Sequence, residues 1–491
     1  MARLVILGAG VAGHTAASFA AKWLSETEDE VVVVTPNALW NWIPSNIWVG
    51  VGEMAKEEVT FDLAPVYEKA GAIYKQAKAV SINPEGSADT NKSFVTIEFT
   101  GQDKEGESEN IEYDYLINAT GPKLNFDATP GLGDGNGHLG EHTVSVCTAD
   151  HAIHASHVLD ETIEQMRKGE RKKFLIGTGH GMCTCQGAAF EYIFNIEHKL
   201  KEEGVRDMAD MTWISNESFL GDFGMGGLHF NMGGFVTSSK VFAESLYAER
   251  GMDWIIGAHV NKVEAGKVTY ETLDGEIDEQ EFDFAMLIPP FAGVGLKAYN
   301  KAGEDITDTV FAPNGFMKVD ADYTAKPYEE WLPSDWPRTL QNPTYKNMFA
   351  VGIAFAPPHP ISKPMKSPNG TPIIPTPPRT GMPSAMMGKA VVSSIVDMMK
   401  GKTTEPTHTS SMAEMGAACV ASAGKGLFSG TAAAMTVFPI VPDFKKYPGT
   451  GRDINGTTGE IGLAAHWVKH LLHHAFIWKA KLKPGWTLIP E

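Results

Sequence analysis

Apolar and polar positions alternate along the chain in blocks that predict strands followed by helices. Residues 3–7 form a short apolar run, Arg3-Leu4-Val5-Ile6-Leu7, and residues 15–24 have the composition of a helix. A second apolar run covers residues 30–34. Short apolar strands separated by helices are typical of a parallel sheet with helices on its faces. We therefore expect an α/β fold.

A glycine-rich turn joins the first strand to the first helix. It reads Gly8-Ala9-Gly10-Val11-Ala12-Gly13 and fits G-x-G-x-x-G directly between a strand and a helix. Such glycines allow a tight turn and a close approach of backbone to a pyrophosphate, while the helix start favours negative charge. The turn therefore predicts a dinucleotide site that includes Gly8, Gly10, Ala12 and Gly13.

The second strand departs from the usual pattern, because it ends in Thr35-Pro36-Asn37 and not in an acid. A neutral group would then hold the adenosine ribose, with Thr35 and Asn37 as candidates. This departure weakens an NAD site more than an FAD site.

Two further segments indicate a flavin cofactor. The strand from residue 114 ends in Ala119-Thr120-Gly121, which is typical of the second cofactor contact in flavoproteins with two dinucleotide-type domains. A later strand in residues 342–352 ends in Gly352 and would bring backbone amides to the cofactor. We therefore predict FAD, bound in part by Thr120, Gly121 and Gly352.

Residues 172–290 repeat the strand–glycine turn–helix pattern, with strands near residues 174, 211–214, 254–256 and 285–288 and a helix from 188 to about 200. The turn begins Gly177-Thr178-Gly179 but has Met182 in place of the third glycine. Cys183 and Cys185 stand where a pyrophosphate would lie. This unit therefore predicts a redox-cysteine site facing a flavin, without a competent NAD site.

Length and charge narrow the classes of protein. The 491 residues predict two or three domains. We place a first part of the FAD domain at 1–160, the second unit at 161–300, a return to the FAD domain at 301–400 and a C-terminal segment at 401–491. The net charge of −19 argues against a nucleic-acid partner. Four cysteines do not make a disulfide scaffold, and no metal site is expected.

Residues 357–378 and 461–482 have unusual compositions. The first segment is rich in proline and predicts an ordered extended loop, with a plain linker as the alternative. The second interleaves aromatic residues with Lys and His, a pattern typical of a helix lying on a membrane surface. The alternative is an ordinary surface helix packed on the core. No run of about 18 apolar residues occurs, so we expect peripheral association.

Taken together, the motifs resemble those of the sulfide:quinone oxidoreductases, in the flavin disulfide reductase superfamily. The resemblance covers nearly the whole chain. It is carried by the segments Val146-Cys147-Thr148-Ala149-Asp150-His151-Ala152, Cys185-Gln186-Gly187-Ala188-Ala189-Phe190-Glu191, Trp213-Ile214-Ser215-Asn216-Glu217 through Gly226-Gly227, residues 342–352, Arg379-Thr380-Gly381-Met382 and the small-residue stretch around Cys419.

The resemblance implies two Rossmann-like domains followed by an amphipathic helical segment that anchors the protein to a membrane surface. It implies that a cysteine pair and FAD oxidise sulfide to sulfane sulfur or polysulfide and reduce a membrane quinone, in a homo-oligomeric, peripheral membrane protein. The implied catalytic residues are Cys185 and Cys419 as the redox pair, Cys147 as a third cysteine, Cys183 as either spare or bridging, Glu191 for proton handling and His151 near the site. Further implied binding residues are Arg379, Thr380 and Gly381 near the flavin, and Lys469 in the tail.

Three positions depart from the family pattern. The family's Pro-Lys-Thr-Gly motif appears as Pro378-Arg379-Thr380-Gly381, which keeps a cation near the flavin. Asp222 stands where the family often has a histidine, and Leu472 stands where it has a quinone-stacking phenylalanine, which Trp467, Phe476 or Trp478 would have to replace. For Asp222 we favour an ionised side chain that is turned away or paired with a cation. Proton handling would then lie with His151, His180 or Glu191. The alternative is burial that raises its pKa and makes it a neutral acid.

Two other functions compete with this interpretation. A type II NADH:quinone oxidoreductase would need a complete glycine motif in the second unit and an acid after its second strand, for which Glu217 is the candidate. A flavoprotein subunit like that of flavocytochrome c sulfide dehydrogenase would pass electrons to a protein. At the chemical level, the position of Cys185 near a helix start predicts thiolate character.

Overall fold

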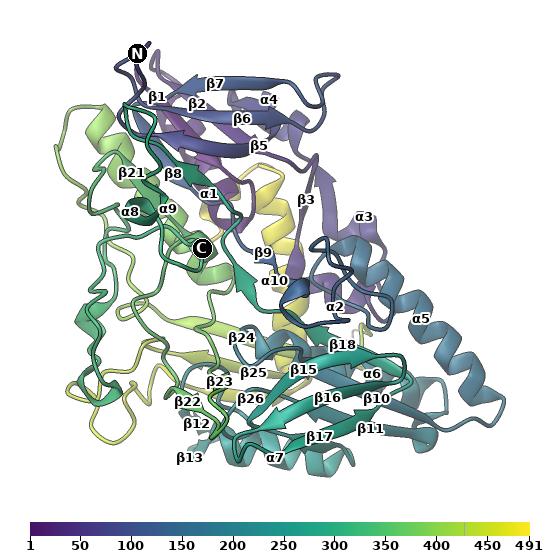
Figure 1. Ribbon diagram of the computed structural model, residues 1–491. Helices are drawn as coiled ribbons and strands as arrows, with labels where there is room; N and C mark the ends of the chain where they lie inside the picture. Colours follow the sequence, from purple (N-terminus) through teal and green to yellow (C-terminus); the bar gives the residue numbers. More distant parts are fainter. Residues whose placement is uncertain (427) are drawn as a thin grey trace.

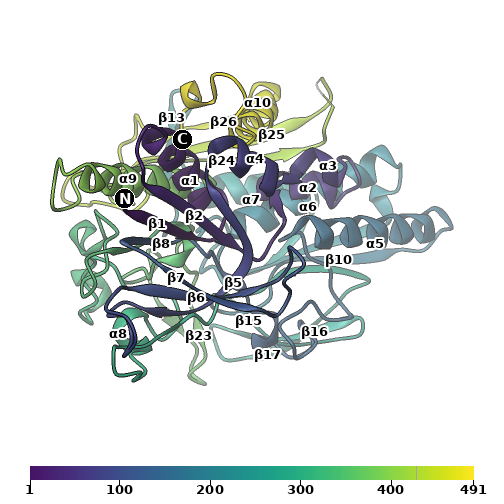
Figure 2. The same cartoon turned by 90° about the horizontal axis from the view of Figure 1, so that it is seen from above.

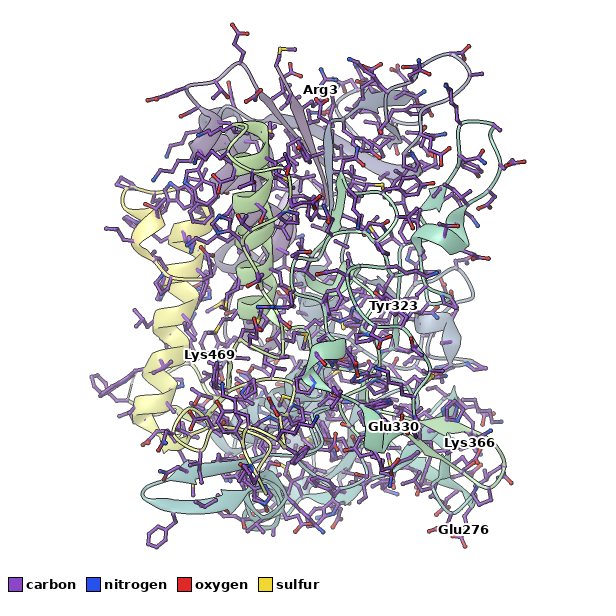
Figure 3. The ribbon with its side chains drawn as sticks, turned by 90° about the vertical axis from the view of Figure 1, so that its left-hand side faces the viewer. Arg3, Glu276, Tyr323, Glu330, Lys366 and Lys469 are labelled. Carbon is purple, nitrogen blue, oxygen red and sulfur yellow. The ribbon has the colours of Figure 1, made fainter. Side chains whose placement is uncertain are left out.

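The computed structural model describes residues 1–426 and 428–491, and Figure 1 shows two α/β units one above the other. Arg3 lies at the end of the first unit and Glu276 at the opposite end of the second (Figure 3). A third, smaller sheet and the long helix α10 (Leu463–Ala480) lie along one side of both units. The chain segments that carry the cysteines meet between these three parts.

The first unit is built on a sheet with the strand order β21-β8-β1-β2-β5-β6-β7. Its strands are β1 (Arg3–Leu7), β2 (Glu30–Thr35), β5 (Ile73–Asn83), β6 (Phe94–Phe99), β7 (Ser108–Glu112), β8 (Tyr115–Asn118) and β21 (Met348–Ala350). Pairing is parallel from β21 to β5 and antiparallel from β5 to β7. Helices α1 (Val11–Leu24) and α9 (Gly381–Met399) pack on each other beside this sheet (Figure 2).

The second unit has a four-stranded parallel sheet in the order β14-β11-β10-β18. Its strands are β10 (Lys172–Thr178), β11 (Ala209–Ile214), β14 (Asp253–Ile255) and β18 (Phe284–Ile288), and its helices are α5 (Ala149–Arg167), α6 (Gln186–Glu202) and α7 (Ser239–Glu249). An antiparallel sheet of β15 (Ala258–Glu264), β16 (Lys267–Thr272) and β17 (Ile277–Glu281) covers it.

The C-terminal part forms an antiparallel sheet of β24 (Ala417–Ala423), β25 (Thr431–Val437) and β26 (Gly459–Gly462), with α10 packed on it. Strand β24 also packs on α6 of the second unit. Its alanines, cysteine and serine are small enough to let a strand lie close against a helix. This contact brings Cys419 to the second unit from more than 200 residues away in the sequence.

The remaining helices and strands are short and connect these parts. They are β3 (Leu39–Asn41), α2 (Asn46–Val49), α3 (Lys56–Val59), β4 (Thr60–Asp62), α4 (Leu63–Ala70), β9 (Lys123–Leu124), β12 (His229–Met232), β13 (Phe235–Ser238), β19 (Phe291–Ala292), β20 (Lys297–Ala298), α8 (Thr307–Val310), β22 (Met365–Lys366) and β23 (Pro372–Ile373). In the part of the chain that the structure describes, no helix combines the length and apolar character needed to cross a membrane.

Candidate flavin and redox-cysteine site

The glycine turn after β1 forms a cradle with one open side. A β-carbon at Gly8 would clash with the carbonyl of Ala119, and one at Gly13 would clash with the carbonyl of Gly8. A β-carbon at Gly10 would meet no atom within 4 Å, so this residue faces open space. The start of α1 has no acidic residue and no side-chain cap, which leaves its first backbone amides free for an anion. The cradle therefore fits the pyrophosphate of FAD.

A second bare helix start lies beside the first. Helix α9 begins at Gly381, and its N-cap residue Thr380 makes no side-chain capping bond. Gly352 has a positive φ of 64°, and a β-carbon there would lie 3.1 Å from that of Ala12 on α1. Helix dipoles from α1 and α9 therefore favour negative charge at neighbouring places, as a dinucleotide with a flavin ring requires.

The other predicted FAD contacts lie at the ends of β2 and β8. Thr35 is buried, while Asn37 is exposed and its carbonyl accepts a hydrogen bond from Tyr74. The hydroxyl of Thr120 donates to Asn118 at 2.7 Å, and Gly121 has a positive φ of 69° with open space at its β-carbon position. Their direct contact with FAD stays a prediction.

Arg379 supplies a buried positive charge. Its guanidinium donates to the carbonyls of Ile353 and Phe355 at 2.8 and 2.6 Å, and it lies over the ring of Phe316. Burial lowers the pKa of Arg379 to about 10, while the nearby thiol of Cys185 acts in the opposite direction. At neutral pH the arginine is therefore a fixed cation beside Cys185.

The four cysteines gather at the start of α6, and all are free thiols. Cys185 is the N-cap of α6 and has a φ of 65°, which residues other than glycine rarely adopt and which is often found at functional sites. A β-carbon on Gly187, two residues further, would lie 3.5 Å from Sγ of Cys419. The fold therefore brings Cys419 next to the helix start that carries Cys185.

Cys147 and Cys183 lie in the same cluster but differ in their surroundings. The nearby Cys147 and Cys419 each raise the pKa of Cys185, and Cys147 also raises the pKa of Cys183. Cys147 is half-buried, and Ser145 accepts a hydrogen bond from its backbone amide. Cys183 is fully buried, and its thiol donates to the carbonyl of Ile288 at 3.0 Å. Cys183 therefore has a structural contact that occupies its thiol.

Burial dominates the acidity of these thiols. It raises the pKa of Cys185 to about 12 and that of Cys419 to about 11, and it also raises the pKa of Cys147 and Cys183. Cys419 is nevertheless exposed on one side, so its thiol is crowded by protein without being enclosed. The thiolate character expected for Cys185 from its position at a helix start is wrong for this state, because burial outweighs the helix dipole.

Glu191 forms a buried ion pair that joins three elements. Its Oε2 accepts from Lys469 of α10 at 3.0 Å, and its Oε1 accepts from the amide and hydroxyl of Ser422 on β24 at 3.0 and 2.9 Å. Lys469 also donates to the carbonyls of Pro44 and Val420. Glu191, predicted for proton handling, and Lys469, predicted for the quinone site, therefore form an ion pair. Ser422, which binds Glu191, lies three residues from Cys419 along β24.

His151 lies in the first turn of α5, beside the ring of Phe126. Its Nδ1 is buried and has no hydrogen-bond partner among the described residues, and burial lowers the pKa of the ring. His180 stands edge-on to His259, and burial lowers its pKa to about 4. Both histidines are therefore neutral at pH 7, which allows either to accept a proton only weakly.

Asp222 combines features of the two outcomes considered for it. It is 2% exposed, accepts hydrogen bonds from the Ser362 hydroxyl at 2.5 Å and the Gly224 amide at 2.9 Å, and lies within electrostatic reach of Arg452. Burial raises its pKa, and the hydrogen bonds and Arg452 oppose that rise. Among the described residues, no hydrogen bond or ion pair connects Asp222 with a cysteine, His151 or Glu191.

The glycine turn of the second unit is closed to a nucleotide. The amide of Ile374 donates to Gly181 and the amide of Thr376 donates to Cys183, so the proline-rich segment runs over the turn. The side-chain amide of Asn216 also donates to the carbonyls of Gly181 and Cys183. The predicted ordered loop is therefore present, and it occupies the approach that a pyrophosphate would need.

Glu217, the weak candidate for an NAD ribose contact, is buried and bound inside the protein. Its carboxylate accepts from Ser215 and from the amide of Phe223, both at 2.7 Å. Burial and the nearby Asp222 raise the pKa of Glu217 to about 8. A buried, internally bonded carboxyl group cannot also receive ribose hydroxyls.

Helix α10 has the reverse of the usual amphipathic pattern. The polar residues His466, Lys469 and His473 face the protein and are buried. The apolar residues are exposed instead: Leu471 by 67%, and Trp467, Val468 and Trp478 by a little over 40%. Soluble helices normally bury their apolar face, so this outer surface has the character of a membrane-contacting one.

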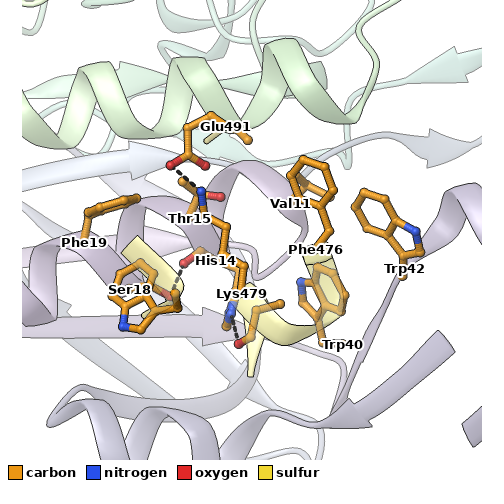
Figure 4. A pocket seen from close by; sticks show the side chains of 13 residues that line it. Val11, His14, Thr15, Ser18, Phe19, Trp40, Trp42, Phe476, Lys479 and Glu491 are labelled. Carbon is orange, nitrogen blue, oxygen red and sulfur yellow. Dashed lines mark hydrogen bonds and ion pairs between the residues drawn. The ribbon is translucent and has the colours of Figure 1, made fainter. Parts of the chain in front are cut away.

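An aromatic pocket lies between α10, α1 and the chain end (Figure 4). Phe476 stacks on Trp42 with ring centroids 5.0 Å apart, and Trp40 and Val11 complete the wall. Lys479 and Glu491 form an ion pair of 2.7 Å at the opposite side. Of the aromatic residues considered as substitutes at Leu472, Phe476 is the one that lines this pocket.

Sequence reasoning missed Ser422, Asn195 and Ser45. Asn195 donates to the carbonyl of Ser422, and Ser45 bonds His473 of α10 at 2.8 Å. Glu191 and Asn195 are four residues apart on α6, so their shared helix face was a signal for a common partner. That the partner is β24 depends on a tertiary contact that no local pattern encodes.

Comparisons with known proteins indicate the class of enzyme. Residues 2–189 match the family described as pyridine nucleotide-disulphide oxidoreductase. The chain is 28% identical over 480 residues to the sulfide-quinone reductase of Aquifex aeolicus (strain VF5), covering 97% of this chain and 91% of that protein. It is 22% identical over 355 residues to the mitochondrial sulfide:quinone oxidoreductase of Dictyostelium discoideum, covering 71% of this chain and 64% of that protein.

Solved structures give the same result. The X-ray structure of the sulfide:quinone oxidoreductase from Aquifex aeolicus superposes with a TM-score of 0.73 at 28% identity, covering 98% of this chain and 92% of that chain. The NDH2 structure from Plasmodium falciparum in complex with NADH has a TM-score of 0.60 at 12% identity, with coverage of 98% and 96%, and shows a shared fold alone.

Fold, cradle and comparisons define the protein as an FAD-dependent oxidoreductase. The α/β fold class and the FAD cofactor predicted from the sequence are confirmed. Within this class the chain resembles the sulfide:quinone oxidoreductases, as its cysteine motifs indicated.

Proposed function

We propose that the protein is a sulfide:quinone oxidoreductase, which oxidises sulfide with the pair Cys185 and Cys419 and passes the electrons through FAD to a membrane quinone. The observation that carries this proposal is the approach of Cys419 to the start of α6, directly after Cys185. Two thiols from such distant segments meet where a related fold would hold a nucleotide. Their convergence supports thiol chemistry in place of nucleotide binding.

The pair acts by thiol–disulfide exchange. Both cysteines are free thiols in this structure, and the reaction starts from the oxidised enzyme, in which a disulfide would join them. Hydrosulfide attacks one sulfur of that disulfide, the S–S bond breaks, a persulfide forms on the attacked cysteine and the other cysteine leaves as thiolate. When bound, FAD would supply a two-electron acceptor. Arg379 stabilises the thiolate of Cys185 electrostatically, since each influences the ionisation of the other.

Glu191 and Lys469 support proton transfer on the quinone side. Reduction of a quinone consumes two protons with two electrons, so a proton donor is needed near the acceptor. Lys469 Nζ carries protons that it shares with Glu191 Oε2 at 3.0 Å, and Ser422 holds the other carboxylate oxygen in place. The pair therefore connects the strand of Cys419 with the helix whose outer face is apolar.

We place the quinone and the membrane at α10. The exposed apolar face of this helix supports peripheral attachment to a membrane surface. This attachment also favours quinone over the protein acceptor of a flavocytochrome c-like subunit. Association into a homo-oligomer is part of the proposal and is tested by light scattering in detergent.

Steady-state assays test the function directly. The FAD-loaded enzyme is mixed anaerobically with sulfide and a short-chain quinone, and loss of the quinone absorbance is followed. We expect sulfide-dependent quinone reduction that is lost in Cys185→Ala and Cys419→Ala. Sulfide oxidation that reduces cytochrome c but no quinone would instead support the flavocytochrome c-like alternative.

A further inference from the structure

A mixed group of metal-binding side chains lies outside the flavin site. Glu53, in the turn after α2, meets His198 and Glu202, which are four residues apart on α6. One ligand atom from each of the three side chains lies within 4.8 Å of the others. No sequence motif pointed to this group, because its members come from segments nearly 150 residues apart.

Three buried atoms of the group make no hydrogen bond. Both carboxylate oxygens of Glu53 and Nε2 of His198 are shielded from solvent, and among the described residues no hydrogen bond satisfies them; Nε2 has only the longer 3.4 Å contact with Glu202. Buried polar atoms are normally paired, so a cluster of unpaired ones requires an explanation such as a bound ion.

The neighbouring lysines do not pair with Glu53. Lys199 and Lys425 influence Glu53 from a distance, but Lys199 pairs with Glu203 at 2.9 Å and Lys425 pairs with Glu58 at 3.5 Å. His198 Nε2 and Glu202 Oε1 are 3.4 Å apart. This separation is close to the roughly 3.3 Å that two ligands adopt around a tetrahedral zinc ion with bonds of about 2.0 Å.

Gly424 packs closely against the ring of His198. It follows β24 directly, has a positive φ of 78°, and a β-carbon there would clash with Nε2 of His198. The same face of α6 holds β24 through Glu191 and Asn195. The group therefore lies at the far end of the contact that positions the strand of Cys419.

We propose that Glu53, His198 and Glu202 bind a divalent transition-metal ion of the Zn²⁺ type, which ties the turn after α2 to α6 next to the Cys419 strand. One imidazole and two carboxylates suit zinc and its neighbours better than Mg²⁺ or Ca²⁺, which prefer oxygen ligands alone. This proposal is independent of sulfide oxidation, and its test does not use catalysis.

The test is calorimetric titration of the FAD-loaded protein with Zn²⁺. Because thiols also bind zinc, all proteins carry Cys185→Ser and Cys419→Ser, which leave the proposed metal site unchanged. We expect one binding event whose affinity falls by about tenfold or more in Glu53→Gln and His198→Gln. His157→Gln, which changes an exposed histidine on α5, is the matched control and should bind zinc like the parent.

Two outcomes would overturn the proposal: equal zinc binding in the parent and both site variants, or Mg²⁺ binding as tight as that of Zn²⁺. If a site variant does not fold, thermal unfolding replaces the titration. Zinc should then raise the midpoint of the parent, and Glu202→Gln, at an exposed ligand, should diminish that rise. No rise in the parent, or an equal rise in Glu202→Gln, would equally contradict the proposal.

Discussion

At the scale of single residues, the thiol of Cys185 is subject to opposing effects. The start of α6 and the cation of Arg379 favour its thiolate, while burial favours the neutral thiol and raises its pKa to about 12. The sequence shows the helix start but not the crowding, because the crowding comes from segments distant in the chain. The position of this residue was predictable, and its acidity was not.

A pH series of alkylation tests this assignment. In the reduced enzyme, iodoacetamide should modify Cys185 and Cys419 slowly at pH 7, because only the thiolate reacts. The rate at each site should rise about tenfold per pH unit and keep rising beyond pH 9, since both pKa values lie near 11 to 12. Peptide mass spectrometry resolves the four cysteines. A plateau below pH 8 would show a stabilised thiolate.

Single cysteine replacements separate the redox pair from the extra cysteine. Cys185→Ala and Cys419→Ala should keep FAD and slow flavin reduction by sulfide by about a hundredfold or more, because they remove the exchange chemistry. Cys183→Ala should stay within a few-fold of wild type, since its thiol is bound to the Ile288 carbonyl. Rapid-mixing absorbance measures all three. An equal loss in Cys183→Ala would make Cys183 the bridging residue.

Asp222 is tested by a replacement that keeps its shape. Asn at this position still accepts the hydrogen bonds from Ser362 and Gly224, so Asp222→Asn should reduce the flavin with sulfide at a rate within a few-fold of wild type. The same rapid-mixing assay applies. A loss of about a hundredfold with FAD still bound would mean that Asp222 takes part in proton transfer.

At the scale of elements, local patterns predicted which segments form helices and strands better than they predicted which side chains point inward. The strands β1, β2, β10 and β18 follow from short apolar runs, and helix α1 follows from the glycine turn, although it begins at Val11 and not at residue 15. The aromatic, Lys and His composition of α10 predicted a surface-seeking helix. It did not reveal that the polar residues point inward, because that depends on Glu191 and Ser45, which lie far away in the sequence.

Substitutions on the outer face of α10 test membrane attachment more cleanly than deletion, because deletion would also remove Lys469 from Glu191. The double variant Val468→Gln with Leu471→Gln should move from the vesicle pellet to the supernatant in sedimentation with lipid vesicles. The reason is that the native Val468 and Leu471 side chains both expose apolar surface, which the substitutions remove. Sulfide should still reduce the flavin. Ile277→Gln, at an exposed apolar residue on β17, is the control. Undiminished sedimentation of the α10 variant would exclude this face as the anchor.

At the scale of the whole molecule, the two units share a strand–turn–helix arrangement, but one glycine turn is open and the other is covered by another segment of the chain. The first turn is open at Gly10, whereas residues 374–376 cover the second. The sequence predicted the loss of a nucleotide site from Met182 and the cysteines. The covering segment and the meeting of Cys419 with α6 are long-range contacts, which require the folded structure.

The central claim is that electrons enter through the cysteine pair and not through a nicotinamide nucleotide. The most direct measurement is anaerobic mixing of the FAD-loaded enzyme with either sulfide or NADH, following the visible absorbance of the oxidised flavin. Sulfide should bleach the flavin and NADH should leave it oxidised, because residues 374–376 and the buried Glu217 close the second turn. Bleaching by NADH, with sulfide inactive, would contradict the account.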